Sequence, residues 1–263
     1  MVRRDLKSID WKFGHHWIRE SFPDYELRHQ KDPKRFPELL PRIFPGSYAP
    51  IIHRDTQGQL TMAPMRYGAY PPDFIPENSK YTSYNARRDN LHSNFWSTAF
   101  GQHHGFIVLT EFFEWVAVAD LLSAGIVSLD QVQREFERQT AERKAKILAS
   151  GKLYKPTPTE KKDPRFRKII ISFRPKQPSG ILVPVIYSSK VLEPGLLDYG
   201  FAIVTDEPPP EVLAAGHDRC PIYLEEDAVS AWLEPQGKSA RELASLLDQK
   251  PKLVFEHGLA EAA

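Results

Sequence analysis

The sequence predicts a mixed α+β domain in which strands dominate and helices are peripheral. Short apolar runs separated by turn residues recur along the chain, 23 prolines outnumber 14 glycines, and one segment alone has strong helical features. Rigid proline-containing loops between short strands are typical of sheet proteins rather than of helical bundles. A chain of 263 residues can bury a sizeable core, so we expect one elaborated domain over residues 1–263.

The first strands are expected in a hairpin over residues 49–68, with Asp55-Thr56-Gln57-Gly58 as its turn. Later strand-like runs are short and largely apolar, as in buried strands. They predict strands at residues 106–109, 169–173, 181–186, 200–205 and 252–257, with the second and third forming a pair.

Residues 128–149 have the clearest helical pattern. Ser128 and Gln131 fit a capping box at the start, and Glu142 and Lys146 have the i,i+4 spacing of an ion pair. The apolar stripe of this helix fades after Phe136, so we expect only one end to pack on the body. Residues 227–248 predict two shorter helices, the second over about 239–247.

Composition and charge exclude several classes of function. The net charge of +1 provides no overall positive field, so any DNA contact has to come from local basic clusters. Cys220 is the single cysteine, which excludes disulfides within the chain and cysteine-based zinc sites. The adjacent pairs His15-His16 and His103-His104 lack metal-ligand spacing, so we interpret them as structural and expect no metal and no cofactor.

The first residues lack the apolar stretch of a signal peptide. The longest apolar segment is interrupted by Glu114 and Asp120, which makes it a poor membrane span. We therefore expect a cytoplasmic protein with no membrane partner.

Three polar groups are expected at three strand ends, from which a sheet could direct them into one pocket. Asn85 follows a strand-like run, Glu114 closes an apolar run, and His217 lies beyond the run at 200–205. A carboxylate and an imidazole suit proton transfer. Arg87 and Arg219 accompany them, and a guanidinium matches the geometry of phosphate oxygens.

The same segments, in this order, resemble the SOS response-associated peptidase (SRAP) family, and its phage-related branch most closely. The family shows a W-G-hydrophobic-x-P segment, an N-A-R segment, an F-x-E-W segment and an H-D-R-M-P segment. Each is weak alone, whereas four in order over residues 47–235 are fairly specific. The matching pieces are Ser47-Tyr48-Ala49-Pro50, Met65-Arg66-Tyr67-Gly68 with Pro71, Tyr84-Asn85-Ala86-Arg87, Phe112-Phe113-Glu114-Trp115, Phe201-Ala202-Ile203-Val204-Thr205 and His217-Asp218-Arg219-Cys220-Pro221.

The resemblance implies a barrel-like central sheet and a function on DNA. Family members recognise abasic sites in single-stranded DNA and, through a cysteine that follows the initiator methionine, form a thiazolidine cross-link to the opened sugar. The residue roles that it implies are orientation of the nucleophile or sugar for Asn85, proton transfer for Glu114, sugar ring opening for His217 and phosphate binding for Arg87 and Arg219. Tyr67 is a candidate for stacking on exposed bases.

The chain departs from the family at position 2, which is Val2. Either Val2 stands where the family has its cysteine, or residues 1–23 are an extension within the N-terminal region 1–45 and the family start falls near Asp24. In both cases we expect the thiazolidine to be lost and binding to abasic or gapped single strands to remain. A freed Val2 amine could still form a reversible imine with the sugar aldehyde.

Residues 116–167 are interpreted as an insertion that carries a basic loop at 152–168. It could extend the DNA path or bind a protein partner. The alternative function is therefore an inactive SRAP-fold scaffold or interaction module, and the enzyme class stays open between peptidase, abasic-site lyase and cross-linking protein. Cys220 is interpreted as a small core residue, although a thiol beside a histidine and an arginine could act as a substitute nucleophile.

Overall fold

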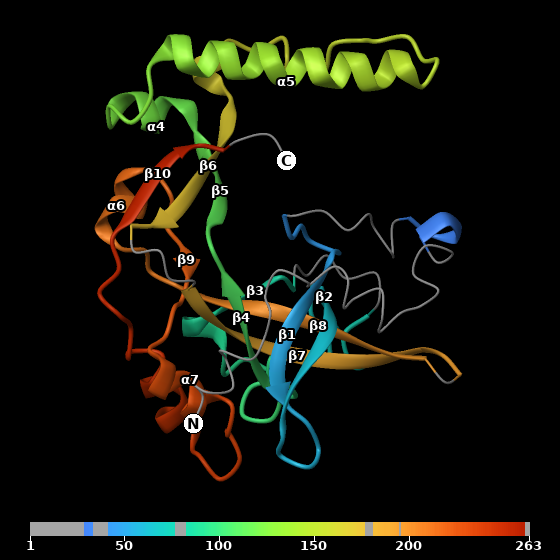
Figure 1. Cartoon of the computed structure of the whole chain (residues 1–263), viewed down its shortest axis with the longest axis vertical. Helices are drawn as coiled ribbons and strands as arrows, with labels where there is room; N and C mark the ends of the chain where they lie inside the picture. Colours follow the sequence, from blue (N-terminus) through green and yellow to red (C-terminus); the bar gives the residue numbers. More distant parts are fainter. Residues whose placement is uncertain (1–28, 34–41, 77–82, 177–180, 195, 261–263) are drawn as a thin grey trace.

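The computed structural model describes residues 29–33, 42–76, 83–176, 181–194 and 196–260 (Figure 1). In these ranges the strands form two sheets, a larger one and a smaller one of three strands. The strands are β1 Tyr48–Arg54, β2 Leu60–Tyr67, β3 Asn85–Arg87, β4 His104–Leu109, β5 Phe112–Ala117, β6 Lys168–Pro175, β7 Ile181–Glu193, β8 Leu196–Asp206, β9 Cys220–Pro221 and β10 Phe255–Leu259. The helices are α4 Val118–Ser123, α5 Leu129–Ala149, α6 Pro210–Ala214, α7 Glu226–Trp232 and α8 Ala240–Leu246, with 3-10 turns η2 Arg88–Asn90 and η3 Pro164–Phe166.

The larger sheet closes on itself as a barrel in the order β2-β1-β4-β7-β8. Closure comes from a parallel pairing of β2 with β8, in which Tyr67 is opposite Phe201. Gly200 permits this close approach, because a Cβ atom at that position would lie 2.4 Å from the carbonyl oxygen of Gly68. The α+β class and the barrel-like sheet expected above are confirmed.

Strands β4, β7 and β8 contain runs that are buried on both faces, which explains their continuous apolar sequences. In β8, Phe201 and Ile203 pack into the core that also receives the second sheet, whereas Ala202 and Val204 pack into a second core with α7. Because successive side chains of a strand point to opposite faces, this one strand contributes residues to both cores.

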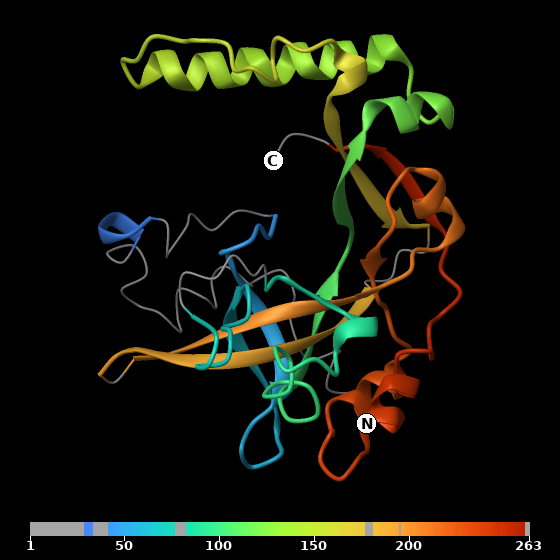
Figure 2. The ribbon, with the colours of Figure 1, turned by 180° about the vertical axis from the view of Figure 1, so that it is seen from behind.

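The smaller sheet has the order β10-β6-β5 and rises from the barrel in Figures 1 and 2. The predicted pairing of residues 169–173 with 181–186 is wrong, because β6 pairs with β5 and β10 while β7 pairs with β4 and β8. The last strand begins at Phe255, three residues later than predicted. The hairpin of β1 and β2 and the short helices α7 and α8 are confirmed.

Between β5 and β6 the chain leaves the sheet as α4, α5 and a returning loop. Ala117 and Lys168 still pair in the ladder, so the excursion covers residues 118–167. The predicted capping box of Ser128 and Gln131 is present at the start of α5. Glu142, however, pairs with Arg138 rather than Lys146, because the Arg138 guanidinium lies between Glu135 and Glu142.

One end of α5 packs on the body, as expected. Val132 and Phe136 are buried in the core that α4 also joins, and the guanidinium of Arg167 lies 3.4 Å from the centre of the Phe136 ring. Most of the helix projects sideways from the smaller sheet (Figures 1 and 2). No helix in the described ranges is long and apolar enough to cross a bilayer.

Candidate functional site

Strand β8 aligns three of the segments that carry predicted site residues. Along one edge, Phe201 pairs with Tyr67 of β2 and Ile203 pairs with Asn85 of β3. At Thr205 both edges are occupied, by Arg87 on one side and Pro221 on the other. Segments that are far apart in sequence therefore meet at fixed registers along a single strand.

Glu114 belongs to the other sheet, where β5 pairs with β6 opposite Ile171. Strand alternation places Glu114 on the same face as the buried side chains of Phe112 and Val116. Its carboxylate therefore lies at the margin of the core, with 24% of the side chain exposed, while Trp115 on the opposite face is 58% exposed. The prediction of a strand-end carboxylate is wrong, since Glu114 lies in the middle of β5.

His217 contacts Glu114 from the segment between α6 and β9. Helix α6 ends at Ala214, and Gly216 takes a positive φ of 85° that turns the chain towards β9. The turn brings His217 Nε2 to within 2.9 Å of Glu114 Oε2. On the other side of the ring, Nδ1 lies 2.6 Å from the carbonyl oxygen of Arg219.

Both ring nitrogens of His217 thus face an acceptor, an arrangement that favours the doubly protonated imidazolium. The hydrogen bond with Glu114 raises the pKa of His217, against the opposing effect of partial burial. Because the side chain is 22% exposed, a bound molecule could still reach this pair. The arrangement is suited to donating a proton from the ring and accepting one at the carboxylate.

Tyr67 and Asn85 form a second polar pair at the same end of the barrel. The Tyr67 hydroxyl donates to Asn85 Oδ1 at 3.1 Å, and its ring stacks on Phe201 at 5.1 Å between ring centres. Burial, and then the negative charge of Glu114, raise the pKa of Tyr67. The pair of Tyr67 and Asn85 is therefore coupled electrostatically to the pair of Glu114 and His217. Asn85 is the first residue of β3, whereas the strand-like run expected before it, residues 81–84, lies partly outside the described residues.

The two predicted phosphate ligands, Arg87 and Arg219, both approach Asp89. Arg87 Nε and Nη2 donate to the two carboxylate oxygens of Asp89 at 3.0 and 2.5 Å. Arg219 Nη2 lies 3.7 Å from the same carboxylate, and its buried Nε has no hydrogen-bond partner among the described residues. Sequence reasoning did not single out Asp89, although its place two residues after Arg87 was a local sign of such a pair.

Comparison with known proteins decides the family. The model of the SOS response associated peptidase (SRAP) family matches residues 12–257, which is most of the chain. The chain belongs to the SRAP family. A comparison with curated proteins gave no match.

Solved structures share the SRAP fold at low sequence identity. A phage-related protein from Bordetella bronchiseptica is 18% identical, with a TM-score of 0.53 and 88% of each chain covered. A second protein from that organism is 16% identical, with a TM-score of 0.53 and 90% of this chain and 95% of the other covered. A protein from Bacteroides thetaiotaomicron is 16% identical, with a TM-score of 0.50 and coverages of 81% and 74%.

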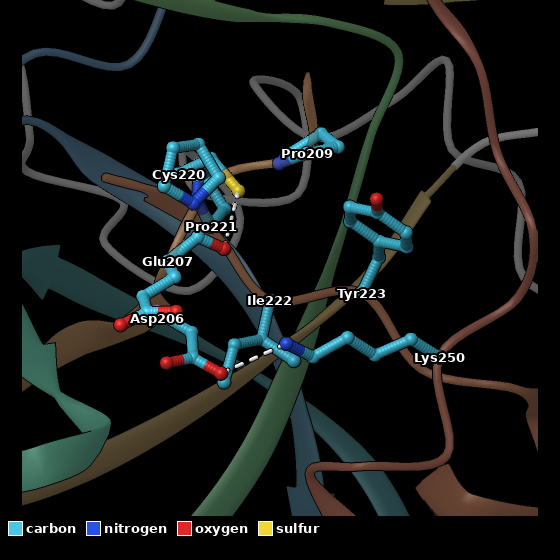
Figure 3. Close-up of a pocket in the computed structure, with 9 residues that line it drawn as sticks. Asp206, Glu207, Pro209, Cys220, Pro221, Ile222, Tyr223 and Lys250 are labelled. Atoms are coloured by element: carbon cyan, nitrogen blue, oxygen red, sulfur yellow. Dashed lines mark hydrogen bonds and ion pairs between the residues drawn. The ribbon is translucent and has the colours of Figure 1, made fainter. Parts of the chain in front are cut away.

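Cys220 of this SRAP chain lines a half-open cavity of about 320 Å³ beside β9 (Figure 3). Its thiol is buried and lies 3.9 Å from the carbonyl oxygen of Glu207. Burial raises the pKa of Cys220 to about 12, so the thiol stays protonated near neutral pH. The cavity wall is completed by Asp206, Pro208, Pro209, Pro221, Ile222, Tyr223 and Lys250.

Of the His103-His104 pair, His104 is held by hydrogen bonds at both ring nitrogens. His104 Nδ1 lies 3.0 Å from the carbonyl oxygen of Trp232, and its Nε2 accepts from the backbone of Gly101 at 2.9 Å. Burial lowers the pKa of His104 to about 3, so the ring is neutral. No cluster of three potential metal ligands occurs within the described ranges, and His15-His16 lies outside them.

Proposed function

We propose that this SRAP protein binds single-stranded DNA at abasic or damaged sites and does so without forming the thiazolidine cross-link. The observation that carries the proposal is the pair of Glu114 and His217, held at 2.9 Å and accessible to solvent. A carboxylate and a protonated imidazole that share one face provide both halves of a proton exchange. Membership of the SOS response associated peptidase family supports a role for such an exchange in the response to DNA damage.

At an abasic site the pair would act on the closed sugar. Glu114 accepts the proton of the C1′ hydroxyl, the C1′–O4′ bond breaks, and His217 delivers its proton to O4′. The products are the open-chain aldehyde and a 4′ hydroxyl, and a proton passed back from Glu114 restores His217. Asn85 and Tyr67, joined by a hydrogen bond of 3.1 Å, would orient the sugar, and the negative charge of Glu114 acts on the Tyr67 hydroxyl.

Phosphate contacts would position the strand around this pair. Arg87 is exposed and Arg219 is partly exposed, and both guanidinium groups gather around the single carboxylate of Asp89. Phosphate oxygens could accept hydrogen bonds from these guanidinium groups in the same geometry as the carboxylate oxygens of Asp89. Such contacts are independent of sequence and weaken with salt.

A thiol-dependent cross-link is not expected from Cys220. A thiolate is the nucleophilic form, and the buried Cys220 thiol has a pKa of about 12. The proposal therefore assigns noncovalent recognition, with imine chemistry at an amine as the one covalent route to be tested.

The test compares 30-nucleotide single strands that are identical except for one abasic site. We expect tighter binding to the abasic strand by fluorescence anisotropy, and no adduct on a denaturing gel without borohydride. His217→Gln and Glu114→Gln should each reduce the abasic preference about tenfold, whereas Glu234→Gln, at a surface ion pair with Arg54, should not.

Each contrary result is specific. Equal binding to intact and abasic strands overturns the proposal and favours an interaction module. A borohydride-independent adduct contradicts the loss of cross-linking, and one that requires borohydride identifies an imine at an amine.

A further inference from the structure

Charge is distributed unevenly along this nearly neutral chain. We call residues 129–168 the arm; it contains 12 basic and 6 acidic side chains, while the rest of the chain contains 23 basic and 28 acidic ones. The arm therefore has a net charge of +6 and the remainder −5. Within the arm, residues 143–162, which we call the basic tip, hold seven basic side chains and one acidic side chain.

The basic tip is held by contacts within the arm rather than by the body. Arg143 Nη1 pairs with Glu160 at 2.8 Å, and its guanidinium lies 5.3 Å from the centre of the Tyr154 ring. Glu160 also accepts from the backbone of Thr157 at 2.6 Å, which orders the turn before the chain returns. The loop therefore runs back along α5, as Figure 1 shows, and presents its side chains on a defined scaffold.

The lysines of the tip are exposed, and one of them, Lys144, lies 6.0 Å from the centre of the Tyr154 ring. Arg143 uses the one acidic residue of the tip, and the lysine side chains make no ion pair with any residue that the structure describes. These lysines are Lys144, Lys146, Lys152, Lys155, Lys161 and Lys162.

Stabilisation of the helix accounts for only part of this charge. Cations in the last turn of a helix interact favourably with its dipole, which covers Lys146 at the end of α5. The effect decays within one turn and does not extend to the returning loop. Four lysines lie in that loop, beyond the part of the helix whose dipole could stabilise them.

We propose that the basic tip binds the phosphate backbone of DNA that flanks the candidate site. Charge complementarity selects this partner, since phosphates supply a regularly spaced row of anions for a row of unpaired lysines. The inference rests on the proposed function for the presence of DNA at Glu114.

The dimensions define which nucleotides the tip would contact. Glu114 lies three residues before the end of β5, a distance of about 10 Å. The tip begins about 21 Å along α5. At about 3.4 Å per nucleotide, these two lengths correspond to about 9 nucleotides from the lesion to the start of the tip, and the contacts would extend outwards from there.

The experiment removes three charges from the tip and three from elsewhere. The tip variant is K152Q/K155Q/K162Q, and the matched control is K176Q/K190Q/K252Q, which changes exposed lysines outside the arm. Both are titrated by fluorescence anisotropy with single strands of about 30 and about 6 nucleotides, intact or with one abasic site, over a range of sodium chloride concentrations. Circular dichroism checks that each variant is folded.

We expect the tip variant to bind the longer strand about tenfold more weakly near 0.1 M salt, with a salt slope smaller by about 2. The short strand and the control variant should change little. If both variants lose affinity for the longer strand equally, or if neither loses affinity, the role of the tip is overturned. This holds even where the preference for abasic strands persists. A tip-specific loss without abasic preference retains this inference and overturns the proposed function, while absence of DNA binding overturns both.

Discussion

Arg87 and Asp89 form a two-point ion pair two residues apart, with Nε and Nη2 at 3.0 and 2.5 Å from the carboxylate oxygens. The pair is exposed, so its own contribution to stability is small. The pair matters because its carboxylate also engages a second arginine: Arg219 Nη2 lies 3.7 Å from Asp89. One acidic side chain therefore engages both arginines that we propose for phosphate binding.

Removing that carboxylate should strengthen DNA binding. For Asp89→Asn we expect affinity for single strands to rise about three- to tenfold at low salt, because both guanidinium groups become available to phosphate. Glu234→Gln is the matched control, since it removes an equally exposed acid paired with Arg54. Binding that is unchanged or weaker in Asp89→Asn would show that Asp89 positions the arginines instead of competing with phosphate.

Abasic preference should depend on pH through His217. Its pKa is raised by the hydrogen bond with Glu114, so the cationic form and the stability that it adds are fully present below about pH 6.5. Both are lost as pH rises through the higher pKa of the folded state. We expect abasic preference to fall between about pH 6.5 and 9 in the unmodified protein and to be flat in His217→Gln. A preference that increases with pH in this range contradicts the assignment.

The Cys220 thiol should resist alkylation in the folded protein. It is buried, and its pKa of about 12 leaves little thiolate at pH 8. We expect iodoacetamide to modify it at least about a hundredfold more slowly than in the urea-unfolded chain. Mass spectrometry gives both rates. Rapid modification of the folded protein would mean that the cavity beside β9 exposes a reactive thiol.

Gly200→Ala should destabilise the barrel at its closure. The added Cβ would lie 2.4 Å from the Gly68 carbonyl oxygen, which belongs to the backbone and cannot rotate away. We expect a loss of about 1–3 kcal/mol in the free energy of unfolding, measured by urea denaturation. Gly58→Ala is a useful contrast, because its Cβ would meet no atom within 4 Å and its cost arises from a positive φ alone. Equal costs at the two positions would argue against steric closure at Gly200.

Features with a local cause were predictable from sequence, whereas distant pairings were not. The capping box of Ser128 depends on residues three apart, and it was correctly predicted. The pairing of residues 169–173 was wrong because the strand that follows in sequence joins the other sheet. Asp89 escaped notice for a related reason, since its approach to Arg219 requires β8 to bring β3 and β9 to the same residue, Thr205.

The candidate site residues were found as separate segments, and their geometry came only with the structure. Motif spacing selected Glu114 and His217 but misplaced Glu114 at a strand end. Their contact depends on how the two sheets meet and on the turn at Gly216. Short-range patterns do not specify such a meeting.

Ala117 pairs directly with Lys168 in the sheet, so the length of the arm between them is independent of the position of Glu114. Residues 118–167 leave the sheet and return to it at this one residue pair. A longer or shorter α5 would therefore not shift the register that places Glu114 opposite Ile171. Whole helical turns added beyond Phe136 would move the basic tip outwards by about 5.4 Å each. Under the proposed function, a longer arm would let the tip contact DNA further from the lesion, while Glu114 would keep its place in the sheet.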